Sequence, residues 1–230
     1  MINLMGSLSN TGYGVATKYI LKELDRQRVE VSLHPYGQAQ CETQEEADLY
    51  QKMINVPFGY DWPCINIWHQ FELARHVGRG KYIAWPIFEL DEFNEKEKHH
   101  LGFPDALVVC SKWAKAVVDD AIGPANISVV PLGVDIDIFK PKDLGIRTDY
   151  TFFNIGKWEK RKGHDILFKL FSDAFEPSDN VRLVMAPFNP FLHPQEIESW
   201  EVAYKNCKLH DKISFVPEMA THAQVANLIQ

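Results

Sequence analysis

The chain has 230 residues, of which 46% are hydrophobic and 24% are charged, and its formal net charge is −7. This composition is typical of a folded globular protein and excludes an intrinsically disordered chain. The excess of acidic residues also argues against general affinity for nucleic acids or anionic membranes, although a local basic patch would still be compatible with it.

The N-terminal stretch MINLMGSLSNTGYG has no basic region before its short apolar run, so it does not resemble a signal peptide. No apolar run approaches the roughly 18 residues of a membrane span. The four cysteines form no C-x-x-C pair, and we expect Cys64 and Cys110, which lie in apolar runs, to be buried free thiols. These features predict a cytoplasmic protein without structural zinc or disulfides, and a peripheral position at the inner face of a membrane stays open.

In the first part of the chain, apolar runs alternate with amphipathic patterns, as in a parallel sheet covered by helices. We therefore predict an α/β fold whose first Rossmann-like domain spans residues 1–140. Its expected strands are 2–5, 29–36, 64–69, 81–88, 106–111 and 127–135, and its expected helices are 12–27, 44–54 and 112–122.

The composition then becomes polar over residues 137–149, and we place an interdomain linker at 141–149. The α/β alternation restarts and predicts a second Rossmann-like domain over 150–230. Doubly wound sheets usually have five or six strands, so this second domain, with about three, is expected to be incomplete. Its expected strands are 150–156, 181–188 and 212–216, and its expected helices are 162–175, with an apolar face of Ile166, Leu167, Leu170 and Phe171, 194–207 and 221–230.

Three glycines, Gly6, Gly12 and Gly14, lie in the first strand-to-helix turn, MGSLSNTGYGVA. Their spacing fits neither G-x-G-x-x-G nor the P-loop pattern, so an NAD-dependent enzyme is a weak alternative. Two interpretations of this turn stay open. It is either a tight turn that needs positive φ angles or an anion-binding loop at a helix N-terminus.

The stretch GKWEKRKG, residues 156–163, gathers Lys157, Lys160, Arg161 and Lys162 between two glycines at the second strand-to-helix turn. Like charges at a helix N-terminus oppose the helix macrodipole, so this placement is unfavourable unless an anion binds there. We predict that Lys157 and Lys162 grip a diphosphate as mobile point charges and that Lys160 and Arg161 face solvent. The alternative is a solvated helix start.

The order of several segments is also informative. The Gly-rich turn is followed by DALVVCSKWAKAVV, then by ISVVPLGVDIDIFKP, and after the linker by NIGKWEKRKGHDIL and VRLVMA. This order resembles the family 4-like glycosyltransferases of the GT-B fold, whose motifs vvPnGvD...F.P and G[RK]....KG.d.L look like residues 129–141 and 156–167. The resemblance covers most of the chain, is strong from Asp105 to Met185 and is weak from Cys41 to Ile83.

The resemblance implies two Rossmann-like domains that face a cleft, the first receiving the acceptor and the second holding a nucleotide-sugar donor. Family 4 members retain the anomeric configuration and usually need no metal, so we expect no cofactor. By resemblance, Lys157 and Lys162 bind the donor diphosphate, although the first position is often Arg, whose bidentate geometry Lys lacks. Gly12 and Gly14 would lie against the donor phosphates, and Tyr13 between them would shape the acceptor side.

Four further polar residues follow predicted strands, at the edge where α/β sheets place ligands. We assign His69 as the catalytic residue near the transferred sugar. The alternative is a structural histidine at a strand end, whose hydrogen bonds are satisfied within the protein. Glu89 and Asp91 either bind acceptor hydroxyls or cap a helix that begins near Asn94. Ser111 either contacts the acceptor or sugar, or caps the helix that follows it.

One departure from the family is clear. The acidic E-x7-E stretch, which helps to hold the donor sugar and ribose, has no counterpart, because the chain ends at Gln230 where it would follow. Two functions are therefore expected from the sequence. The first is a retaining glycosyltransferase that uses a nucleotide-sugar donor and a glycan or other hydroxyl acceptor. The second is a truncated, catalytically incomplete module that binds nucleotide or glycan, or assembles with a partner or a second copy through its incomplete domain.

Overall fold

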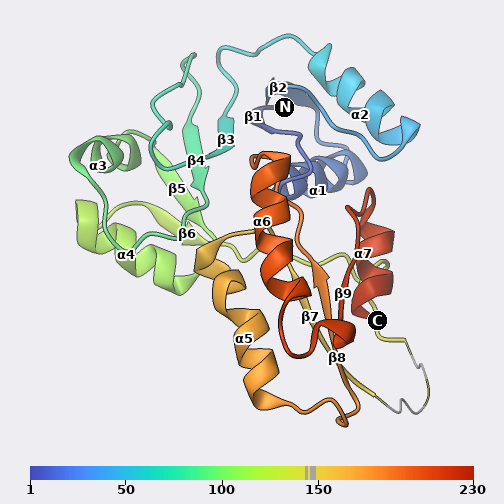
Figure 1. Cartoon of the computed structure of the whole chain (residues 1–230). Helices are drawn as coiled ribbons and strands as arrows, with labels where there is room; N and C mark the ends of the chain where they lie inside the picture. The colour runs from blue at the N-terminus through green and yellow to red at the C-terminus, as the bar shows by residue number, and fades with distance from the viewer. Residues whose placement is uncertain (143–144, 146–148) are drawn as a thin grey trace. The chain divides into compact units, whose positions relative to one another are not determined.

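The computed structural model describes residues 1–142, 145 and 149–230. The chain divides into two compact units, Met1–Gly133 and Val134–Gln230, whose elements are labelled in Figure 1. The sequence placed the end of the first domain at residue 140. Of the predicted linker 141–149, residues 143–144 and 146–148 lie outside the described residues.

The first unit contains a six-stranded sheet with the strand order β2-β1-β3-β4-β5-β6. All of its paired strands run parallel, as the alternation of apolar runs and helices predicts. The strands are β1 Ile2–Ser7, β2 Val31–Tyr36, β3 Cys64–Trp68, β4 Tyr82–Pro86, β5 Ala106–Val109 and β6 Ile127–Val129, and the helices are α1 Gly12–Arg26, α2 Gln44–Ile54, α3 Glu95–Gly102 and α4 Lys112–Ile122.

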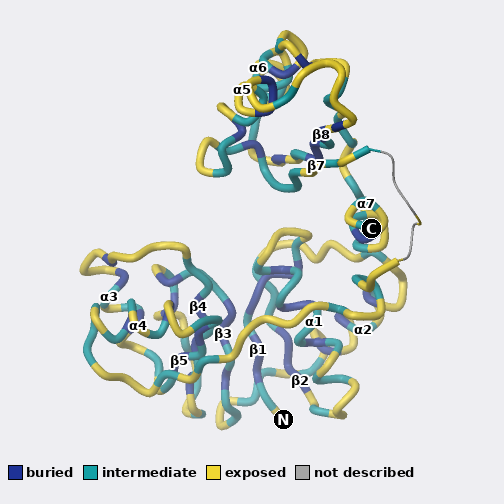
Figure 2. The backbone as a smooth tube through the Cα atoms, turned by 90° about the horizontal axis from the view of Figure 1, so that it is seen from below, coloured by how far each residue is buried: buried dark blue, intermediate teal, exposed yellow. Residues whose placement is uncertain are grey.

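The core of this unit lies on both faces of the sheet. Cys64 and Ile67 of β3 are fully buried but belong to different clusters, because side chains three residues apart on a strand point to opposite faces. Leu21 of α1 packs in one cluster and Val118 of α4 in the other. Figure 2 shows the buried residues concentrated along the strands of this sheet. The arrangement leaves the carboxyl ends of the parallel strands at one edge, where ligands bind in such sheets.

The second unit is smaller and has the same architecture. Its described part contains a three-stranded parallel sheet of order β7-β8-β9, and Trp158, Phe171, Leu183 and Tyr204 are buried in its core. Both units are therefore Rossmann-like, as predicted. The elements are β7 Tyr150–Ile155, β8 Val181–Ala186 and β9 Ile213–Phe215, with α5 His164–Ala174, α6 Pro194–Lys205, α7 His222–Ile229 and two 3-10 turns, η1 Lys160–Lys162 and η2 His210–Lys212.

Several expected elements differ in detail. The strand expected over 127–135 pairs only as far as Val129, because the Pro/Gly loop begins immediately after it. The expected apolar face of α5 is wrong in part: Ile166 and Leu170 are 51% and 56% exposed, while Phe171 is buried. Cys64 is buried as expected, but Cys110 is only partly buried.

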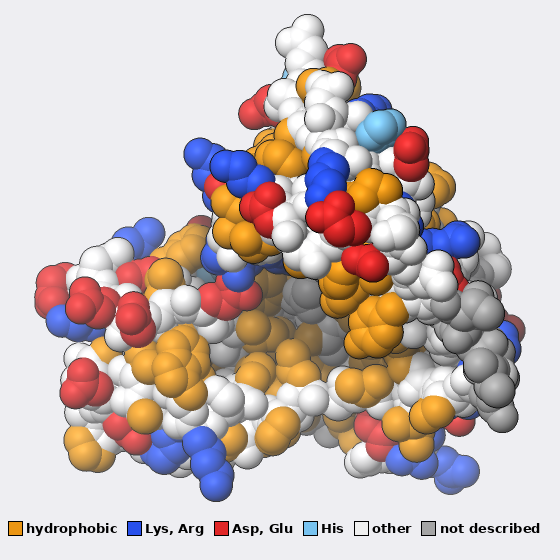
Figure 3. Space-filling view, turned by 60° about the horizontal axis from the view of Figure 1, so that its bottom comes forward, with side chains coloured by type: hydrophobic (Ala, Val, Ile, Leu, Met, Phe, Trp, Pro, Cys, Tyr) orange, Lys and Arg blue, Asp and Glu red, His pale blue; other side chains and the backbone are white. Residues whose placement is uncertain are grey.

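The surface agrees with the acidic composition. On the face drawn in Figure 3, Lys and Arg side chains lie among Asp and Glu side chains and do not form one continuous basic field. A positive field of that kind is what sequence-independent binding to nucleic acid needs. The positive charge of residues 156–163 is therefore a local feature of the surface.

Candidate functional site

The basic loop connects β7 to α5 at the carboxyl edge of the second sheet. Lys160, Arg161 and Lys162 form the 3-10 turn η1, and Gly163 ends it with a left-handed φ of 73° before α5 begins at His164. The charges therefore precede the N-terminus of α5 and do not occupy its first turn. Lys160 and Arg161 are exposed, as predicted, while Lys157 and Lys162 are half-buried.

An acid within the loop changes its charge balance. Glu159 forms ion pairs with Lys157, at 3.2 Å, and with Arg161, at 3.0 Å. Although desolvation opposes it, these contacts lower the pKa of Glu159 below its usual value, so it stays ionised at neutral pH. The premise that four unopposed cations crowd a helix start is therefore wrong, since Glu159 offsets part of the positive charge.

Lys162 is the cation of the loop best placed to meet an anion. No ion pair joins it to any residue in the described part of the chain. Its ammonium lies against Gly156, where an added Cβ would stand only 2.6 Å from Nζ. Gly156 also has a φ of 151°, a conformation that other residues rarely adopt. The glycine thus lets this lysine fold across the end of β7.

A buried tryptophan, Trp158, attaches the basic loop to the core of the second unit. Trp158 is 2% exposed and stacks on Trp200 of α6, with ring centroids 5.5 Å apart. Its backbone carbonyl accepts a hydrogen bond of 3.0 Å from the side chain of Asn189, in the loop after β8. With Trp158 fixed in the core, the neighbouring Lys157 is held at the surface on a rigid support.

His164 fixes the other end of the loop, and the sequence analysis missed it. Its Nδ1 accepts a hydrogen bond of 3.1 Å from the Glu159 N–H, and its Nε2 lies 2.7 Å from Oδ1 of Asn154 on β7. The amide oxygen can only accept, so Nε2 carries the ring proton. Burial, then the charge of Lys162, lowers the pKa of His164 and keeps the ring neutral.

Because of this shift, we expect His164 to make the folding stability depend on pH. The unfolded histidine titrates near its ordinary pKa of about 6.5, whereas the folded one takes up its proton only at lower pH. Stability contributed by neutral His164 is therefore complete above pH ~6.5 and is lost as the pH falls below it.

His164→Ala should cost about 1–3 kcal/mol at neutral pH, because buried partners lose their hydrogen bonds. The deficit should shrink at pH ~5, since the wild type alone loses the His164 contribution there. Urea unfolding at both pH values measures this, with the exposed His210→Ala as the control. A deficit that stays constant between the two pH values would contradict it.

Exposed aromatic side chains stand beside the basic loop. Phe191, in the loop after β8, is 74% exposed, and Nζ of Lys157 lies 5.2 Å from its ring centroid. Phe188 in the same loop is 43% exposed. Large apolar side chains left in water beside cations suit a ligand that carries both a planar or apolar part and negative charge.

The Gly-rich turn of the first unit is not the tight turn with positive φ angles that was one of its two expected structures. Gly6, Gly12 and Gly14 all lack a positive φ, so the tight-turn interpretation is wrong. Gly14 is required for close approach, because an added Cβ would lie 2.0 Å from the backbone oxygen of Ser9. Around Gly12 there is open space. The N-cap residue Thr11 makes no side-chain cap hydrogen bond, and of the two helical glycines Gly12 is exposed whereas Gly14 is buried. Anion binding at this helix N-terminus stays a prediction.

The two glycines form a matched pair for mutagenesis. We expect Gly14→Ala to destabilise the protein by about 1–3 kcal/mol, because the backbone of Ser9 would have to move to admit the methyl group. Gly12→Ala, in open space at the start of the same helix, should change stability by less than about 0.5 kcal/mol. Thermal unfolding compares them, and equal losses would show that the Ser9 contact is unimportant.

His69 lies in an aromatic cluster at the carboxyl edge of the first sheet. Its Nδ1 is 2.9 Å from the hydroxyl of Tyr13, which also contacts the carbonyl oxygen of Ile87. The ring stacks on Phe71, with centroids 4.9 Å apart, and meets Trp68 edge-on at 5.0 Å. The structure thus brings Tyr13 and His69, two of the predicted site residues, into direct contact.

The remaining predicted residues fall into two groups. Ser111 caps α4 by accepting a hydrogen bond of 3.0 Å from the N–H of Ala114, which confirms the capping interpretation. Glu89 and Asp91 are exposed after β4. Neither caps α3, because Asn94 does so in a capping box with Glu97. Contact of Glu89, Asp91 or Ser111 with an acceptor stays a prediction.

Comparison with known proteins identifies the architecture. No family model and no curated protein matches this sequence. Among solved structures, it is similar to HepE of Anabaena in complex with UDP-glucose (TM-score 0.68, 14% identity, 97% of this chain and 70% of that one). It is also similar to a sucrose-phosphate synthase from Thermosynechococcus elongatus (0.70, 14%, 98% and 72%) and to the lipopolysaccharide outer core galactosyltransferase WaaB (0.60, 14%, 98% and 70%). The chain has the GT-B fold.

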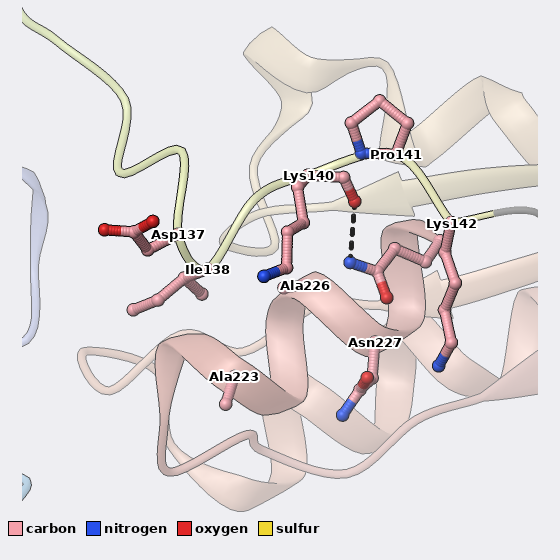
Figure 4. A pocket seen from close by; sticks show the side chains of 9 residues that line it. Asp137, Ile138, Lys140, Pro141, Lys142, Ala223, Ala226 and Asn227 are labelled. Carbon is pink, nitrogen blue, oxygen red and sulfur yellow. Dashed lines mark hydrogen bonds between the residues drawn. The ribbon is translucent and has the colours of Figure 1, made fainter.

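The described part of this GT-B chain has a cavity of about 400 Å³ that none of the predicted site residues lines. It lies within the second unit, between the segment 137–142 and α7, where Gln230 donates a hydrogen bond of 2.9 Å to the carbonyl oxygen of Lys140 (Figure 4). The predicted site residues lie elsewhere: Gly12, Tyr13 and Gly14 are in the first turn of α1, and Lys157 and Lys162 are in the basic loop.

Two kinds of feature are absent from the part of the GT-B chain that the structure describes. Among the residues that the structure describes, no three His, Cys, Asp or Glu side chains are grouped as a metal site requires. None of the described helices has the length and apolar character needed to cross a membrane.

Proposed function

We propose that the chain is a retaining glycosyltransferase of family 4 type, which moves a sugar from a nucleotide-diphosphate sugar to a hydroxyl acceptor. The observation that carries the proposal is the basic loop, in which Lys162 has no ion-pair partner among the described residues and Lys157 is braced on buried Trp158. Transfer of the sugar leaves negative charge on the departing diphosphate, and fixed cations stabilise that charge.

Five of the predicted residues then have a role in this reaction. Lys157 and Lys162 neutralise the diphosphate in the second unit. The amides at Gly12 and Gly14, at the uncapped start of α1, favour negative charge in the first unit. His69 acts at the transferred sugar, and the GT-B fold together with the UDP-glucose bound to HepE supports a nucleotide sugar as donor.

The exposed edge of the second sheet favours a second candidate function. Its described part has three strands, and β7 at its edge exposes Tyr150 and Phe153. An unpaired edge with apolar side chains is a surface that other strands can complete. The alternative proposal is therefore a module that binds nucleotide or glycan and becomes active only with a partner, or with a second copy, that completes this sheet.

Calorimetric titration with UDP, GDP and ADP, followed by an assay of nucleotide release from UDP-glucose, separates the proposals. Saturable binding of one nucleotide together with catalysed release supports the enzyme. Binding without release supports the incomplete module. Absence of binding by all three nucleotides at about millimolar concentration, a free energy of binding weaker than about −4 kcal/mol, would refute the enzyme and the nucleotide-binding form of the module, and would leave only a glycan-binding module.

A further inference from the structure

The hydroxyl of Tyr13 lies between His69 and a backbone carbonyl. Tyr13 is in the first turn of α1, His69 directly follows β3, and Ile87 directly follows β4. The hydroxyl is 2.9 Å from Nδ1 of His69 and donates a hydrogen bond to the carbonyl oxygen of Ile87. Three separate segments of the first unit therefore meet at this one oxygen atom.

The direction of these hydrogen bonds follows from the donors available. A carbonyl oxygen can only accept, so the single proton of the Tyr13 hydroxyl points to Ile87. Burial, with the charges of Glu89 and Cys110, raises the pKa of Tyr13 to about 12, so this proton is retained at neutral pH. The hydroxyl can then only accept from His69, which requires a proton on Nδ1.

The other ring nitrogen of His69 is consequently an acceptor. Burial lowers the pKa of His69, against the opposing charge of Glu72, so the ring is neutral and carries one proton. With that proton on Nδ1, Nε2 has a lone pair. No hydrogen bond joins Nε2 to any residue within the described ranges, and stacking on Phe71 restrains the ring.

We propose that Tyr13 is a positioning residue that fixes the Nδ1–H tautomer of His69, so that Nε2 accepts a hydrogen bond from a hydroxyl of a bound sugar. The identity of the ligand rests on the proposed glycosyltransferase function, but the tautomer does not. The role differs from that expected from the sequence, which assigned Tyr13 only to the shape of the acceptor side.

The tautomer is measured directly from the ring nitrogens by 15N nuclear magnetic resonance, without ligand and above the ordinary histidine pKa of about 6.5. In the wild type, Nδ1 of His69 should give a protonated-type signal and Nε2 a lone-pair-type signal. Tyr13→Phe keeps the aromatic ring and removes the hydroxyl. The preference for Nδ1–H should then fall about three- to tenfold, the usual effect of one hydrogen bond.

Tyr36→Phe is the matched control. Tyr36 packs on Trp68 in the same cluster, but its hydroxyl bonds Asn66 and not His69, so the His69 tautomer should be unchanged. A wild-type His69 protonated on Nε2, or a Tyr13→Phe ratio equal to that of the wild type, would overturn the proposal. The wild-type spectrum alone can overturn it, even if a variant fails to fold.

Addition of UDP-glucose tests the ligand part. A change in the Nε2 signal, with Nδ1 still protonated, is expected if a sugar hydroxyl donates to Nε2. UDP-glucose binding that leaves Nε2 unchanged would overturn the assigned hydrogen bond. If calorimetry shows that UDP, GDP and ADP all fail to bind, the proposed enzyme and the ligand part fail together, while the tautomer is still decided by the spectrum without ligand. If GDP or ADP binds and UDP does not, the glucose derivative of that nucleotide replaces UDP-glucose in this titration.

Discussion

The double variant Lys157→Ala/Lys162→Ala should bind UDP at least about 100-fold more weakly than the wild type. Hydrogen bonds to charged groups contribute about 1.5–3 kcal/mol each, and two of them would be lost. Lys162→Ala alone should weaken UDP binding more than Lys157→Ala alone. Lys157 already forms an ion pair with Glu159, whereas no ion pair to Lys162 occurs in the described part of the chain. Calorimetric titration of the three variants with UDP measures this order.

The control for this experiment removes the same amount of charge from the same region. Lys160→Ala/Lys169→Ala changes two exposed lysines, one in η1 and one in α5. Exposed charges act through solvent and are screened by salt, so at physiological ionic strength this variant should bind UDP within about threefold of the wild type. An equal loss in both double variants would mean that net charge, and not a specific diphosphate seat, controls binding.

Trp158→Ala should destabilise the second unit by about 3–5 kcal/mol, the usual cost of truncating a fully buried aromatic side chain. Trp158 contacts Trp200 and His164 by ring packing, and its removal would leave a cavity beneath the basic loop. Hydrogen exchange of the amides of β8 and α5 under native conditions reports the stability of this unit separately from the first.

Trp113→Ala is the comparison for this variant. Trp113 lies on α4 of the first unit and is 49% exposed, so its truncation should cost less than about 1 kcal/mol. If Trp158→Ala lost no more stability than Trp113→Ala, the tryptophan would not be the anchor of the loop.

The sequence was sufficient for the order of elements because the signals are local. Apolar runs such as CINIW and VRLVMA mark β3 and β8, and the basic stretch between two glycines marks the loop after β7. The N-cap role of Ser111, one of the two roles expected from the sequence, was accessible for the same reason, since a cap depends on the residues next to it. Both Rossmann-like units follow from this alternation.

The details of the candidate site depended on contacts that are distant in sequence. His164 is held by Asn154, and its carbonyl oxygen accepts a hydrogen bond of 2.6 Å from Tyr204, a partner 40 residues away. The pairing of Glu159 with two of the cations depends on how the η1 turn is formed. Gly14 is constrained by its close approach to the backbone of Ser9 and not by its own φ angle. Neither periodicity nor residue spacing contains this information.

The central claim is that a nucleotide diphosphate binds at the loop from Gly156 to His164. Mapping of backbone amide shifts by 1H–15N nuclear magnetic resonance during a titration with UDP tests it most directly. We predict that the largest changes fall on Gly156, Lys157, Lys162 and Gly163. Saturable changes confined to other parts of the chain would contradict the claim, even if UDP binds tightly.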